Sequence, residues 1–124
     1  MKNAVTWFEL GAAPGTGPAM KEFYAQTFGW TYNEGPDGDY SMVGDSEGPG
    51  IGGGLFEDPE GPSQIVCIEV DDIHGFLAQV MANGGTVVQE PIVIPGMVVY
   101  GKFRDPGGNV VGIVDSNIPD AESE

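Results

Sequence analysis

The chain has 124 residues and a mass of 13.0 kDa, which is enough for one domain with one hydrophobic core. Hydrophobic residues make up 40% of it, but no apolar run approaches the roughly 20 residues that span a bilayer, so we expect no membrane partner. The net charge of −15 repels phosphate backbones and argues against a nucleic-acid partner. No signal-peptide pattern opens the sequence, and we expect a cytoplasmic protein.

The first half of the sequence predicts a strand, a helix and three short strands. Residues 5–10 are rich in aromatic and β-branched residues, as is typical of a strand. Apolar residues at helical spacing then predict a helix over 19–28, which Gly29 ends. Of these helical residues, Tyr24 and Phe28 are expected to be core. The short strands are expected around 30–33, 39–43 and 51–56.

The second half predicts the same order of elements. Residues 65–70 form an apolar strand that contains the single cysteine, Cys67, interpreted as a buried structural thiol with a reactive nucleophile as the alternative. Asp71 or Asp72 is expected to cap a helix that ends at Gly84-Gly85. Three further strands are expected at 86–90, 97–103 and 109–115.

The repeated order, βαβββ, indicates an internal duplication with an offset of about 58 residues. One module covers about 3–58 and the other about 63–116, together forming a single domain over 1–118, and residues 119–124 form an acidic tail. Each half alone buries too little surface to be stable, so we expect the two to fold together. The predicted fold class is α+β, with both modules forming a curved mixed sheet around a cleft, where function is expected.

Several short motifs resemble those of one superfamily. Trp7-Phe8-Glu9-Leu10, then Phe23-Tyr24 and Phe28-Gly29-Trp30, resemble the "FY…FGW" signature of the vicinal oxygen chelate superfamily, which includes glyoxalases, bleomycin-resistance proteins and extradiol dioxygenases. In the second half, Val70-Asp71-Asp72 opens the helix and Asp105-Pro106-Gly107-Gly108-Asn109 resembles that superfamily's "DPxGN" turn. The resemblance covers roughly residues 3–116. It implies paired βαβββ modules around a cleft, often within a homodimer, and it leaves the activity open.

Metal-dependent members of the superfamily take ligands from the first and last strands of each module. By the resemblance, those positions fall at Trp7, Gly54, Ile65 and Gly112, none of which offers a donor atom for a divalent ion. We therefore expect no metal, no cofactor and no catalytic residue. Two apolar residues and two glycines suggest instead a roomy site with an aromatic platform, although glycines can also relieve crowding where modules or subunits meet.

The favoured hypothesis is a metal-free, homodimeric protein that sequesters a small cationic or aromatic compound in an acidic, aromatic cleft, as the resemblance to bleomycin-resistance proteins implies. Two alternatives stay open: a metal-dependent glyoxalase-like lyase or isomerase or a dioxygenase, and a non-catalytic protein-interaction module. The residues expected to line the ligand site are Trp7, Glu9, Tyr40, Met42, Gly54, Phe56, Ile65, Glu69, Met97, Tyr100 and Gly112.

Overall fold

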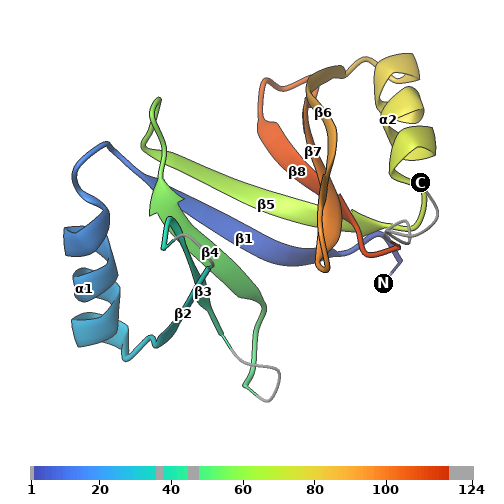
Figure 1. Ribbon diagram of the computed structural model, residues 1–124. Coiled ribbons are helices and arrows are strands. Elements are labelled where there is room, and N and C mark those ends of the chain that lie inside the picture. Colours follow the sequence, from blue (N-terminus) through green and yellow to red (C-terminus); the bar gives the residue numbers. More distant parts are fainter. Residues whose placement is uncertain (1, 36–37, 45–47, 118–124) are drawn as a thin grey trace. The chain divides into compact units, whose positions relative to one another are not determined.

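The computed structural model describes residues 2–35, 38–44 and 48–117 (Figure 1). The expected acidic tail at 119–124 lies outside these residues. The chain divides into two compact units, Thr6–Val66 and Cys67–Glu124, the latter joined by Met1–Val5. Each unit holds the helix and most of the strands of one expected module, so the duplicated βαβββ order is confirmed.

The first module places its helix after the first strand and pairs the first strand with the last. Its strands follow the order β2-β3-β4-β1, with β1 parallel to β4 and the other pairs antiparallel. The elements are β1 (Val5–Ala12), α1 (Gly17–Phe28), β2 (Tyr32–Glu34), β3 (Tyr40–Val43) and β4 (Gly52–Glu57).

The second module repeats this arrangement in the order β5-β8-β7-β6, again with its first and last strands parallel. Mixed parallel and antiparallel pairing with one helix per module confirms the α+β class. The elements are β5 (Ser63–Val70), α2 (Ile73–Ala82), β6 (Thr86–Ile94), β7 (Val98–Arg104) and β8 (Val110–Asp115).

The α2 helix covers one face of its sheet and forms a compact hydrophobic core with it. Ile73 and Leu77 of α2 are buried against Val70, Val99 and Ile113 of three strands. Alternation along β8 thus directs Ile113 toward the helix, as expected, and Gly112 toward the opposite face. Cys67 is fully buried, in agreement with a structural thiol.

The α1 helix is less covered than the sequence pattern predicts. Gly29 adopts the left-handed conformation that ends it, as expected. Phe28, however, is 63% exposed, and Tyr24 is only half-buried, so the expectation that both are core is wrong. Tyr24 instead stacks on Trp30, with ring centroids 4.7 Å apart. Helical spacing identified the apolar face of α1, but the short strands beneath it do not cover all of that face.

A carboxylate at the end of the fourth strand holds the start of the helix in each module. Glu57, the last residue of β4, accepts hydrogen bonds from the backbone N–H groups of Gly15 (3.1 Å) and Gly17 (2.9 Å). Asp115, the last residue of β8, accepts one from the backbone N–H of Ile73 at 3.1 Å. The duplication offset of about 58 residues relates Glu57 to Asp115 and Gly15 to Ile73, so the contact is part of the repeated design.

The turn before β8 also forms as expected. The Asp105 carboxylate accepts hydrogen bonds from the backbone N–H and the side-chain amide of Asn109, and these lower the pKa of that carboxyl. The Arg104 guanidinium donates to the Gly108 carbonyl, which fixes the other side of the turn. Within the described part of the chain, no helix is long and apolar enough to cross a bilayer.

The Glu57 anchor predicts a pH-dependent stability. The N–H groups of Gly15 and Gly17 lower the pKa of Glu57 below its ordinary 4.5. The contribution of Glu57 to the free energy of unfolding is therefore complete above pH 4.5, and it is lost as the pH falls through the folded-state pKa. We expect Glu57→Gln to lower the free energy of unfolding at pH 7, and the difference from wild type to shrink toward pH 3.

Urea unfolding at each pH measures this difference. The control is Glu22→Gln, which removes an exposed carboxylate elsewhere on α1. A Glu57→Gln effect that stayed constant from pH 7 to pH 3 would contradict the role assigned to its charge.

Candidate ligand-binding site

Six of the expected site residues gather on one face of the first module's sheet, opposite α1. In β1, Trp7 lies opposite Gly52 and Glu9 opposite Gly54, while in β3 Tyr40 lies opposite Phe56. Because directly paired residues point to the same side of a sheet, these side chains share one surface. The full set on this face comprises Trp7, Glu9, Tyr40, Met42, Gly54 and Phe56, which are all of the site residues expected from the first half.

A chain of hydrogen bonds links three of these side chains. The Trp7 indole N–H donates to the Tyr40 hydroxyl at 2.9 Å, and that hydroxyl donates to Oε2 of Glu9 at 2.9 Å. The Tyr40 ring also stacks on Phe56, with centroids 5.9 Å apart. Trp7, Glu9, Tyr40 and Phe56 are all half-buried, so each keeps some exposed surface. We call these four residues the aromatic–acid cluster.

Gly54 allows this cluster to form. A Cβ atom built at Gly54 would overlap the Tyr40 ring and hydroxyl. Tyr40 therefore crosses over β4 at Gly54, where no side chain is in the way, and so reaches Glu9 on β1. The expectation that Gly54 leaves open space is corrected: close approach of a ring explains this glycine.

In the second module, too, neighbouring side chains occupy the space beside the corresponding glycine. Gly112 lies opposite Cys67, and a Cβ at Gly112 would come 2.6 Å from the Cys67 sulfur and 3.3 Å from the Tyr100 ring. Its space is filled from within the module. Glu69 and Tyr100 lie on this same face, on either side of Val114, so the structure does bring these two expected residues together.

Two residues that the sequence reading missed engage this pair. The Lys102 ammonium lies over the Tyr100 ring, 5.9 Å from its centroid, and the Ser116 hydroxyl donates to Glu69 at 2.9 Å. Lys102 could have been found by alternation, since it lies two positions from Tyr100 on the same face. The second module thus supplies its own cation to its exposed aromatic ring.

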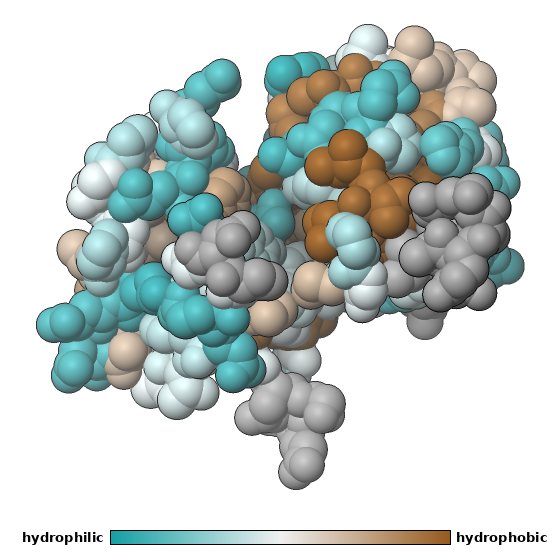
Figure 2. Space-filling model, viewed as in Figure 1, coloured by the Kyte–Doolittle hydropathy of each residue, from teal (hydrophilic) through white to brown (hydrophobic). Residues whose placement is uncertain are grey.

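The remaining expected residues lie elsewhere. Ile65 is buried in β5, with 7% of its surface exposed. Met97 lies in the β6–β7 turn, where its backbone N–H donates a hydrogen bond to the backbone carbonyl of Ile94. Figure 2 shows hydrophobic atoms gathered over β6 and β7, and exposed residues of this region include Ile92, Val93, Ile94 and Met97.

The positions that the resemblance assigns to metal ligands do not fit a divalent metal. Trp7, Gly54, Ile65 and Gly112 provide no oxygen, thiolate or imidazole donor. The nearest carboxylate on the same face, that of Glu9, is bound by the Tyr40 hydroxyl. Across residues 2–35, 38–44 and 48–117, no three His, Cys, Asp or Glu side chains are grouped closely enough to hold an ion. We derive no metal chemistry from this site.

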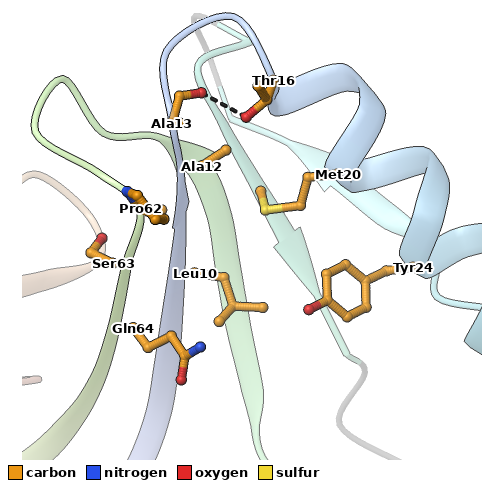
Figure 3. Close-up of a pocket in the computed structure, with 10 residues that line it drawn as sticks. Leu10, Ala12, Ala13, Thr16, Met20, Tyr24, Pro62, Ser63 and Gln64 are labelled. Atoms are coloured by element: carbon orange, nitrogen blue, oxygen red, sulfur yellow. Dashed lines mark hydrogen bonds between the residues drawn. The ribbon is translucent and has the colours of Figure 1, made fainter.

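A hollow of about 610 Å³ lies in the same module on the other side of β1 (Figure 3). It lies between α1, the end of β1 and the start of β5, and none of the expected site residues lines it. The aromatic–acid cluster carries the polar chemistry, so we take that cluster as the candidate site.

A profile of the Glyoxalase/Bleomycin resistance protein/Dioxygenase superfamily matches residues 10–113. The chain belongs to this superfamily, as its motifs and its duplicated βαβββ fold indicated. No curated protein matches the sequence.

Solved structures with the same fold are distant in sequence. A hypothetical protein from Bacillus halodurans C-125 superposes with a TM-score of 0.71 at 13% identity, covering 97% of this chain and 99% of that one. The Mn(II)-bound glyoxalase from Novosphingobium aromaticivorans superposes with a TM-score of 0.66 at 18% identity, and the match covers 93% of this chain and 39% of that one. The 2,2',3-trihydroxybiphenyl 1,2-dioxygenase from Sphingomonas wittichii strain RW1 has a TM-score of 0.65 at 14% identity, and the match covers 97% of this chain and 43% of that one. The chain thus spans less than half of these two enzymes, and the likeness shows the fold alone.

The role of Gly54 predicts a specific defect. Gly54→Ala places a methyl group where Tyr40 lies, so the ring must move and the bonds to Trp7 and Glu9 break. We expect a loss of about 1–3 kcal/mol in the free energy of unfolding, as for other overpacked sites, and a change in Trp7 fluorescence. In the control Gly107→Ala, the nearest atom is a side-chain oxygen of Asp105 at 3.3 Å, which needs to shift only slightly, so the loss of stability should be smaller than for Gly54→Ala. Equal effects in both variants would contradict the steric account.

The donor chemistry predicts how metals act on stability. For chelator-treated protein, we expect manganese, iron, nickel and zinc each to raise the unfolding temperature weakly and alike, because all four screen a net charge of −15. A metal-specific rise that saturates at micromolar concentration would instead indicate native-state binding and contradict the conclusion that these positions do not fit a divalent metal.

Proposed function

We propose that the aromatic–acid cluster binds a flat, cationic organic molecule and holds it without transforming it. The observation that supports this most directly is the hydrogen-bond chain from Trp7 through Tyr40 to Glu9. It places two aromatic rings and a carboxylate on one sheet face, the combination that attracts a cation with a planar face.

The hydrogen bonds also favour cation binding through the Tyr40 ring itself. A phenol that donates to a carboxylate becomes more electron-rich, and hydrogen-bonded chains polarise one another. Its ring face then attracts a cation more strongly. Tyr40 is held on both sides, by Trp7 and by the stack on Phe56, so little ordering is needed on binding.

Charge supports a cationic ligand over an anionic one. The net charge of −15 raises the local concentration of cations around the whole molecule. In the second module, Lys102 already lies over Tyr100, whereas Glu9 is the charged group that contacts Tyr40 in the first. We propose sequestration of the ligand over metal-dependent catalysis, because the positions implied for a metal lack donor atoms.

The test uses 1-methylquinolinium as a flat, monocationic probe, with binding measured by calorimetry at low salt. We expect Trp7→Ala to weaken binding about five- to thirty-fold, which corresponds to the loss of a cation–π contact of roughly 1–2 kcal/mol. Glu9→Gln should weaken binding and reduce its salt dependence. The probe should be recovered unchanged after prolonged incubation.

Two controls make this test specific. Trp30→Ala removes a tryptophan that packs with Tyr24 and lies outside the cluster, and it should leave affinity unchanged. Neutral 1-methylnaphthalene should bind wild type more weakly than 1-methylquinolinium. Unchanged affinity in folded Trp7→Ala, or equal affinity for both compounds, would sink the proposal.

A further inference from the structure

The hollow beneath α1 lies within one module and is open to solvent on one side. The apolar residues Leu10, Ala12, Met20 and Pro62 and the ring of Tyr24 are among those that line it. In Figure 3 Met20 and Tyr24 extend from α1 toward β1, and the hydroxyl end of Tyr24 points toward Leu10. Its volume of about 610 Å³ falls in the range of small-molecule sites, roughly 300–1,000 Å³.

Small residues on β1 and in the loop that follows create this space. Gly11 and Ala12 of the lining are buried and Ala13 is half-buried, so the chain presents only small side chains here, after the aromatic residues earlier in β1. The α1 side chains above them do not fill the gap.

Contacts outside the hollow hold its walls in place. Thr16 lies between Gly15 and Gly17, whose N–H groups are both bound by Glu57. The Ser63 hydroxyl donates to Asp58 at 2.8 Å, and the Tyr24 ring is stacked on Trp30 with an interplanar angle of 13°. A pocket fixed in this way binds without first having to order its own walls.

The polar groups in the lining are all uncharged. They are the hydroxyls of Thr16, Ser63 and Tyr24 and the amide of Gln64. Of these, the Tyr24 hydroxyl and the Gln64 amide bond to no other described residue, so both can pair with a ligand. An anion would meet the repulsion of a net charge of −15, and a cation would find no carboxylate in the lining.

We propose that this hollow is a second binding site, for a neutral amphipathic molecule with an apolar chain and an uncharged hydrogen-bonding head. The chain lies against Leu10, Ala12 and Met20, and the head pairs with Tyr24 and Gln64. This site is separate from the aromatic–acid cluster: it lies on the opposite side of β1 and takes a ligand of different charge.

The methionines distinguish the two sites in one experiment. Met20 lines the hollow, Met42 lies on the face of the aromatic–acid cluster, and Met81 and Met97 are exposed. With methyl-labelled methionine, we expect octanamide to shift the Met20 methyl resonance saturably while Met42 stays unchanged. Octanoate and octylammonium should bind at least tenfold more weakly.

Two variants and one control complete the test. Ala13→Phe fills the edge of the hollow and should weaken octanamide binding at least tenfold, whereas Ala19→Phe, on the exposed side of α1, should not. If Ala13→Phe fails to fold, Tyr24→Phe keeps the ring and removes the hydroxyl, and it should weaken octanamide binding about threefold or more.

Several outcomes would overturn the proposal. They are the absence of a Met20 shift up to the solubility limit of octanamide, Met42 shifts that follow the same titration curve, and equal binding of the charged analogues. Failure of 1-methylquinolinium to bind would leave this result untouched, because the two probes report on different residues.

Discussion

A carboxylate at the end of the fourth strand organises each module. A helix begins with backbone N–H groups that lack partners inside it, and α1 has no side-chain cap of its own. Glu57 supplies the missing acceptor from β4. Asp115 adds an acceptor for α2 from β8, beside the Asp72 side chain that caps this helix by accepting from Gly75 N–H. Because β1 and β4 are parallel neighbours, this bond ties the end of the module to its beginning. Thr16, which lines the hollow beneath α1, lies between the two glycines whose N–H groups Glu57 binds.

The two copies keep the same glycine in the fourth strand but fill its space differently. Over Gly54 lies the ring of Tyr40, which comes from the next strand and reaches Glu9. Beside Gly112 lies the Cys67 sulfur, a smaller and less polar group. Duplication therefore preserved the backbone geometry, while the side chains around it diverged into an acidic aromatic face in one copy and a cation-bearing face in the other.

Local signals made the order of elements predictable from the sequence. Helical spacing, the left-handed Gly29 and the turn at 105–109 each depend on a few neighbouring residues, and all formed as expected. The reach of Tyr40 across Gly54 depends on the pairing of β3 with β4, which lies beyond any local pattern. The exposure of Phe28 and the hollow beneath α1 depend on how far short strands cover a helix. Those features required the three-dimensional structure.

The tip of the β6–β7 hairpin carries no charge and exposes apolar side chains, which affects how the protein behaves in solution. No charged residue occurs between Pro91 and Tyr100, and Ile92 and Val93 are about half exposed there. Within the described residues β6 pairs only with β7, and Pro91 and the nearby register shifts interrupt its outer edge. Charge repulsion between protein molecules also opposes their association through this hairpin, and that repulsion vanishes near the isoelectric point of about 4.1. Colloidal stability in mildly acidic solution is therefore limited by this hairpin, even where each chain stays folded.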